Sequence, residues 1–332
     1  MTRTLVLKDK PGFLQVNHGH DENAGKKGHK DMTYHLINEQ LMIDIAEIGE
    51  YGGSRFDWSG FITGVTLLDG EQSHTYCVPE SLITGVGTGG TGLCNEFGIK
   101  KAIGYDDAKV GEQFPKLGIG LLTRLDDEAY AFDRSYPISP FQVHVEQEDA
   151  CRIVFKAIQE QYKDFSADLT KRISIHNNRL TVEYELYNTG MKEICTDEYC
   201  HNFFGIDGHP VGPDYVLKFP FVINPWSDDK ETMEGLIFSS DAGISTVGWL
   251  RNPEKPFYFQ QKGFEGAKYP WLWELIHQPS GVGVRELSRF SVSDVAVWGQ
   301  GHVLSPEMFI EVKVAPGERK NWSRIYEFFI ES

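Results

Sequence analysis

Long apolar runs are missing from this chain. Residues 1–10 mix polar and apolar side chains and lack the stretch that a signal peptide requires, and no later segment is long and apolar enough to span a bilayer. Basic residues are also few and scattered, since 32 Lys and Arg stand against 48 Asp and Glu, for a formal net charge of -16. Nucleic acid and anionic membrane are therefore unfavourable partners. We predict a soluble, cytoplasmic protein.

The cysteines indicate neither a disulfide framework nor a zinc site. The five cysteines, at positions 77, 94, 151, 195 and 200, form neither CxxC pairs nor the spacing of zinc ligands. An odd number without such pairs favours reduced thiols over a disulfide framework. Cys200 precedes His201, but adjacent residues of a strand point to opposite faces, which disfavours a thiol nucleophile paired with this histidine.

Convincing long amphipathic helices are absent, and short alternating runs take their place. Residues 172–176 and 180–186 flank Asn177-Asn178, a dipeptide that tolerates the positive φ of a tight hairpin. Further runs typical of strands lie at 41–46, 141–145, 152–155, 216–221, 294–297, 308–314 and 325–330. With 332 residues and 40% hydrophobic side chains, the chain has enough apolar surface for a sizeable core. We predict an all-β fold, a large antiparallel β-sandwich, as a single domain over residues 1–332, with 1–35 as a polar extension of uncertain structure.

The glycine-rich segment 85–92 superficially resembles a phosphate-binding loop. No Lys-Ser or Lys-Thr pair follows it, and no helical pattern begins after it. We therefore interpret it as a flexible loop at the rim of a site.

One histidine stands in an unusual setting. His201 lies in the stretch Asp197 to Asp207, followed by Asn202 and by two phenylalanines near the end of a predicted strand. Turn-forming residues at 205–214 would hold it at the mouth of a loop. A histidine suits general acid catalysis because its pKa lies near neutrality. The alternative is a partly buried histidine that bonds a neighbouring carbonyl.

A late strand supplies a candidate carboxylate. In residues 308–314 the two-residue period puts Met308, Ile310, Val312 and Val314 on one face, and Glu311 on the other. An ordinary solvated glutamate is the alternative. Glu307 is the nearest competitor, but its neighbour Pro306 favours a loop position at the entrance of the strand.

These two segments resemble the aldose 1-epimerase (galactose mutarotase-like) family, over about residues 35–328. The segment 201–204 is similar to the motif that carries the family's acid histidine, and Glu311 with the turn at 315–318 is similar to the segment of its base glutamate. The resemblance implies a supersandwich fold, a carbohydrate site on a concave sheet face, and catalysis without cofactor or metal. It also implies that His201 protonates the ring oxygen of a sugar while Glu311 takes the proton of the anomeric hydroxyl.

The same resemblance suggests residues that bind the substrate. Arg55 stands for the family's early arginine, and Lys116 replaces an expected histidine, which makes an acidic or phosphorylated sugar plausible. Glu96 is a candidate acceptor for sugar hydroxyls, with a loop salt bridge as the alternative. His209 and Trp298 are weaker candidates, and a core position is the alternative for Trp298.

Two other functions remain open at this point. A carbohydrate-binding protein without turnover would keep the same fold, and a lyase or hydrolase of uronic acids or oligosaccharides would use His201 differently. The proximity of His201, Asp207 and His209 in the sequence makes a metal site a minor possibility, without a recognised spacing in its favour. Neither the individual sugar nor the oligomeric state follows from the sequence.

Overall fold

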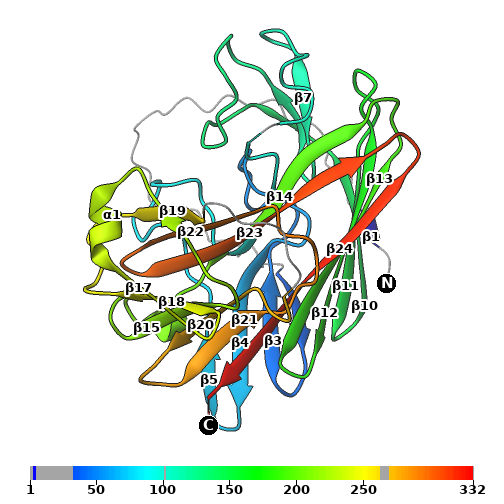
Figure 1. Cartoon of the computed structure of the whole chain (residues 1–332). Coiled ribbons are helices and arrows are strands. Elements are labelled where there is room, and N and C mark those ends of the chain that lie inside the picture. Colours follow the sequence, from blue (N-terminus) through cyan, green and yellow to red (C-terminus); the bar gives the residue numbers. More distant parts are fainter. Residues whose placement is uncertain (1–2, 5–32, 101, 262–268, 332) are drawn as a thin grey trace, which may run out of the picture.

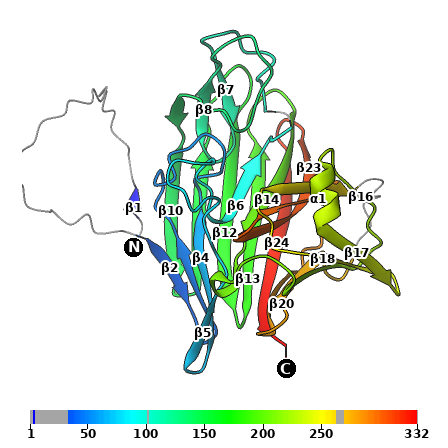
Figure 2. The same ribbon diagram turned by 90° about the vertical axis from the view of Figure 1, so that its left-hand side faces the viewer.

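Two large antiparallel sheets face each other across one hydrophobic core (Figures 1 and 2). The computed structural model describes residues 3–4, 33–100, 102–261 and 269–331. The predicted all-β sandwich is confirmed. Most of the expected extension, residues 1–35, lies outside the described residues, and the single-domain organisation stays a prediction.

The first sheet has eleven strands, and neighbours in the following order are hydrogen-bonded. They are β1 (Arg3–Thr4), β10 (Gln142–Asp149), β11 (Arg152–Ile158), β12 (Ala167–His176), β13 (Arg179–Asn188), β24 (Arg319–Ile330), β21 (Val282–Glu286), β20 (Trp273–His277), β15 (Tyr215–Phe219), β18 (Ile244–Trp249) and β17 (Leu236–Asp241). The predicted hairpin is confirmed as β12 and β13, and Asn177 takes the expected positive φ of 53° in its turn.

The second sheet carries the candidate site. Its hydrogen-bonded order is β16 (Pro225–Trp226), β19 (Phe257–Gln261), β22 (Asp294–Gln300), β23 (Val303–Val314), β14 (Ile194–Phe203), β6 (Gly92–Phe97), β4 (Ile62–Asp69), β3 (Leu41–Ile45) and β2 (Tyr34–Ile37), with β5 (Gln72–Thr75) paired to β4. All the runs that the sequence predicts as strands overlap strands of these two sheets.

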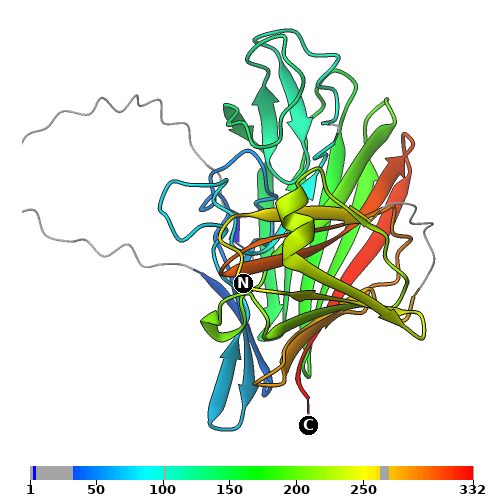
Figure 3. The same ribbon diagram turned by 60° about the vertical axis from the view of Figure 1, so that its left-hand side comes forward.

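Smaller elements stand at the ends of the sandwich. A three-stranded sheet of β7 (Gln113–Lys116), β8 (Gly120–Thr123) and β9 (Ile138–Pro140) projects beyond the large sheets, in teal at the top of Figure 3. A short helix, α1 (Lys230–Gly235), is capped by Asp229, whose side chain accepts hydrogen bonds from two backbone N–H groups of the first turn. A one-turn 3-10 helix, η1 (Ile206–Gly208), follows β14. Among the described residues, no helix has the length and apolar character needed to cross a membrane.

Strand alternation builds the core between the sheets. The predicted apolar face of β23 is buried, with Met308, Ile310, Val312 and Val314 all at 2% exposure or less. A charged group crosses this core: Arg324 of β24 donates to Glu198 of β14 and to Glu286 of β21, each at 3.0 Å. Each buried charge has a bonded partner of opposite charge, which such burial requires. The other face of β14 and β23 points away from this core and holds His201.

Candidate active site

His201 has a carboxylate directly across the sheet. The register of β14 against β23 pairs Asp197 with Glu311, and the isolated bridge between Phe204 and Leu304 continues the same register. Between these pairs the register puts His201 opposite Glu307, and the two side chains meet with Nε2 and Oε1 3.3 Å apart. Two strands that are distant in the sequence thus bring one imidazole and one carboxyl group together.

Burial pushes both groups towards their neutral forms. The side chains of His201 and Glu307 are each 5% exposed. Burial, with a smaller effect of the nearby Arg55 cation, holds the pKa of His201 well below its ordinary value. Burial raises the pKa of Glu307 to about 8, although Arg55 and the hydroxyl of Ser305 act in the opposite direction. Both shifts act in the same sense: at neutral pH they favour an uncharged imidazole beside a protonated carboxyl group.

A second buried cluster closes the site on the side of β6. Glu96 is fully buried and accepts hydrogen bonds from Arg55 Nε at 2.9 Å, from the Tyr199 hydroxyl at 2.7 Å and from Lys116 Nζ at 3.2 Å. Arg55 also donates to Tyr199 at 2.9 Å, and Lys116 donates to the hydroxyl of Tyr130 at 2.9 Å. The predicted residues Arg55, Glu96 and Lys116 are thus brought together, but they bond one another.

The glycine-rich segment is a loop, as predicted, and it reaches this cluster. Thr88 accepts a hydrogen bond from Arg55 at 3.0 Å, and Glu80 holds the loop by accepting from the backbone N–H and the hydroxyl of Thr88. Gly87 takes a φ of +85° in this turn, which an L side chain rarely adopts. The Glu80 carboxylate also lies 3.9 Å from the Arg55 guanidinium. Within this cluster, two cations thus face two carboxylates.

Aromatic side chains surround the histidine. The ring of Phe203 stacks on His201 with centroids 4.0 Å apart, and the half-buried Trp298 meets His201 edge-on at 5.2 Å. Trp298 therefore borders the candidate site. His201 itself lies inside β14 rather than at the mouth of the loop that follows, so the expectation from the turn residues was wrong on this point.

The expected pairing of His201 with Glu311 is not found. Glu311 does point to the same face of the sheet, but it lies four residues beyond Glu307, about 13 Å along the strand. Its side chain is 59% exposed and forms an ion pair with Lys313 at 2.7 Å. For Glu311 the sequence left an ordinary solvated glutamate as the alternative, and its exposed side chain fits this alternative.

Glu307 is the functional candidate that the sequence interpretation set aside. The loop position predicted for it is wrong, because β23 already begins at Val303. Pro306 fits into this strand, where its carbonyl accepts a hydrogen bond from the Asn202 side chain at 2.6 Å. The signal was present in the two-residue period, since Glu307 shares the face of Glu311.

His209 lies apart from the other candidate site residues. Its ring stacks on His277 of β20 with centroids 4.1 Å apart. Asp207 instead accepts from His74 at 2.8 Å, so His201, Asp207 and His209 do not converge on one point. In the described part of the chain no group of three or more His, Cys, Asp or Glu residues is arranged to hold a metal ion.

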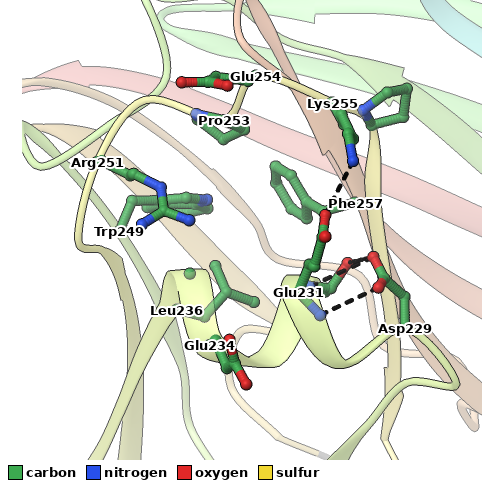
Figure 4. A pocket seen from close by; sticks show the side chains of 13 residues that line it. Asp229, Glu231, Glu234, Leu236, Trp249, Arg251, Pro253, Glu254, Lys255 and Phe257 are labelled. Atoms are coloured by element: carbon green, nitrogen blue, oxygen red, sulfur yellow. Dashed lines mark hydrogen bonds and ion pairs between the residues drawn. The ribbon is translucent and has the colours of Figure 1, made fainter.

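A cavity of about 560 Å³ lies elsewhere, between α1 and β19 (Figure 4). Phe257 of β19 lines it, whereas the next residue, Tyr258, is opposite Trp298 and therefore lies on the other face of the sheet, the face that carries the candidate site. Lys255 and Glu231, at the rim of the cavity, form an ion pair whose side chains are more than 70% exposed. Such solvated groups offer no matched acid and base, in contrast to His201 and Glu307.

Comparisons with solved structures identify the fold. No protein-family model and no curated protein matches the chain. Among solved structures, a protein from Synechocystis sp. is 13% identical, with a TM-score of 0.58 over 93% of this chain and 100% of the other. A galactose mutarotase related enzyme from Lactobacillus acidophilus is 12% identical, with a TM-score of 0.55 over 91% and 100%. A galactose mutarotase-like protein from Lactobacillus casei is 14% identical, with a TM-score of 0.54 over 90% and 100%. The chain has the galactose mutarotase-like fold, as the sequence resemblance implied.

Proposed function

We propose that this protein is an aldose 1-epimerase-like isomerase, in which His201 and Glu307 form the acid and base pair. The observation that carries the proposal is this pair: an imidazole and a carboxyl group 3.3 Å apart, both buried, with burial favouring the neutral form of each. Two titratable groups whose environments push their pKa values away from the ordinary ones are a sign of acid/base catalysis. The named fold neighbours support the same class of reaction.

The protonation states of Glu307 and His201 suit the opening of a sugar ring. The carboxylic acid of Glu307 gives its proton to the ring oxygen as the bond between C1 and this oxygen breaks, and the neutral imidazole of His201 takes the proton of the anomeric hydroxyl as the aldehyde forms. Rotation about C1–C2 and reversal of both transfers give the other anomer. The roles follow from the two pKa shifts, and they reverse the roles expected for a histidine acid and a glutamate base.

We propose a neutral aldose as substrate. The expectation of an acidic or phosphorylated sugar depended on a free ammonium at Lys116. The Lys116 side chain is 2% exposed and its ammonium donates to Glu96 and Tyr130. Arg55 donates to Glu96 and Tyr199 in the same way. Both cations therefore orient the buried cluster rather than a phosphate. The formal net charge of -16 also opposes the approach of an anionic substrate. The five free thiols agree with a cytoplasmic location.

Exchange NMR at the anomeric protons of neutral, acidic and phosphorylated aldoses tests the proposal. Wild type should accelerate exchange of neutral aldoses, and His201→Ala and Glu307→Gln should each lose the acceleration. Glu311→Gln is the matched control, because it makes the same chemical change on the same strand and face, and it should keep the wild-type rate. Sugar binding without accelerated exchange would instead support the carbohydrate-binding alternative. Loss of activity in Glu311→Gln with a fully active Glu307→Gln would refute the assignment of the pair.

A further inference from the structure

The hydrogen-bond ladder between β14 and β23 is interrupted beside Glu307. Phe204 and Leu304 exchange both backbone hydrogen bonds, at 3.1 and 2.8 Å. In an antiparallel ladder the next such pair lies two residues along each strand, at Asn202 and Pro306. Proline has no N–H to contribute, and the Pro306 carbonyl accepts from the Asn202 side chain at 2.6 Å. The backbone N–H of Asn202 therefore requires a different acceptor.

Ser305 supplies this acceptor. Its Oγ accepts from the Asn202 N–H at 2.9 Å and lies 3.2 Å from Oε1 of Glu307. Because a backbone N–H can only donate, the hydroxyl keeps its single hydrogen for Glu307. Ser305 is fully buried, so bulk water does not compete for this hydrogen. The hydrogen bonds thus run in one direction, from Asn202 through Ser305 to Oε1 of Glu307.

The same oxygen faces His201. Oε1 of Glu307 is the atom that lies 3.3 Å from Nε2 of the imidazole. In a protonated carboxyl group, the oxygen that accepts from Ser305 is the carbonyl oxygen, so the proton belongs on Oε2. A carbonyl oxygen beside Nε2 favours a hydrogen on Nε2, and the neutral imidazole then keeps its lone pair on Nδ1. Nδ1 is buried and has no hydrogen-bond partner among the described residues.

Without the bond from Ser305, the carboxyl group would be free to take the opposite arrangement. With its proton on Oε1, Glu307 would donate directly to Nε2 of His201. The acid and the base would then be bonded to each other, and they would have to separate before either reached a sugar. The serine hydroxyl disfavours this arrangement, because a carbonyl oxygen accepts its hydrogen better than the oxygen of a carboxylic O–H does.

We propose that Ser305 is a positioning residue, which places the carboxyl proton on Oε2 of Glu307 and the imidazole hydrogen on Nε2 of His201. The inference rests on the proposed function, to which it adds the acidic oxygen, Oε2, and the basic nitrogen, Nδ1. An anomeric hydroxyl that donates to Nδ1 would satisfy a buried acceptor that lacks a partner. Ser305 acts through Glu307 and touches neither the sugar nor a transferred proton.

The pH dependence of anomeric exchange provides the first test. The Ser305 hydroxyl lowers the pKa of Glu307, in opposition to the larger effect of burial. In Ser305→Ala the fall of the rate at high pH should therefore move upward by about 0.5 to 1 pH unit. At neutral pH, kcat should fall about fivefold with little change in KM. Ser305→Thr keeps the hydroxyl and should restore the wild-type pH limit.

Ser245→Ala is the matched control. Ser245 is equally buried, and its Oγ accepts from the backbone N–H of Ile223 at 3.0 Å. It belongs to β18, in the other large sheet. The control variant should therefore keep the wild-type pH limit, although it loses the same kind of hydrogen bond.

Nitrogen-15 NMR of the imidazole provides the second test, which needs neither sugar nor turnover. The His201 signals are assigned by their absence in His201→Ala. At pH 7 the wild-type spectrum should show a protonated Nε2 and an unprotonated Nδ1, and Ser305→Ala should shift the tautomer towards a protonated Nδ1. Since wild type alone reveals the tautomer, this test also holds where a variant fails to fold.

These outcomes separate the positioning role from the proposed reaction. A wild-type imidazole with its hydrogen on Nδ1 would overturn the role of Ser305. So would a Ser305→Ala variant that keeps the wild-type tautomer or the wild-type pH limit, because slower exchange alone is also what a structural defect produces. The expected tautomer, lost in Ser305→Ala but without exchange of any sugar by wild type, would keep the role of Ser305 and overturn the isomerase.

Discussion

Replacement of Glu307 by glutamine keeps the size of the side chain and removes its ionisation. On folding, the pKa of this carboxyl group rises from 4.5 to about 8 because it is buried. Its contribution to the free energy of unfolding is therefore fully present below pH 4.5 and is lost as the pH rises through about 8. Between about pH 5 and about pH 7 the loss amounts to about 2 to 3 kcal/mol.

Urea unfolding at these two pH values, followed by tryptophan fluorescence, measures the effect. Wild type should lose about 2 to 3 kcal/mol relative to Glu307→Gln on going from the lower to the higher pH. The depressed pKa of His201 acts with the opposite sign, but it acts in both proteins and cancels in the difference. Glu311→Gln, an exposed site on the same strand, should follow wild type at both pH values. A difference between wild type and Glu307→Gln that does not change with pH would refute the buried, protonated carboxyl group.

Two further predictions concern the pair and the core. The rate of anomeric exchange should fall as the pH rises through about 8, because Glu307 loses the proton that it donates, and a pH–rate profile that rises through this value would contradict the assigned role. Arg324→Met should cost about 3 to 5 kcal/mol in urea unfolding, since Glu198 and Glu286 would keep buried charges without a cation, whereas Arg319→Met at an exposed ion pair should cost less than about 1 kcal/mol. Equal costs for the two arginines would contradict the role of the buried network.

Strands were predictable because their signal is local. The alternation in residues 308–314 predicts the buried face of β23, and Asn177-Asn178 predicts the turn between β12 and β13. In β14 the two-residue period correctly separates Cys200, which packs in the core between the sheets, from His201 on the opposite face. Each of these features depends on neighbours within a few residues of the chain.

The carboxylate partner of His201 was not predictable in this way. Pro306 lowers the expectation of a strand, because proline has no N–H for the ladder, and so it moved the choice from Glu307 to Glu311. In the folded chain the Pro306 carbonyl is bonded by Asn202, and the strand continues through it. Similarly, no local pattern indicates that Lys116 and Glu96, which come from different sheets, neutralise each other.

The sequence by itself therefore determined the all-β class, the main strands, and the face on which His201 and the late glutamates lie, because the two-residue period of a strand is written in adjacent residues. The tertiary structure decided which glutamate meets the histidine, because the register between β14 and β23 depends on packing along the whole strand pair. It also decided the charge of the site. Burial neutralises His201 and Glu307, and the partners of Arg55 and Lys116 are set by segments that only folding brings together.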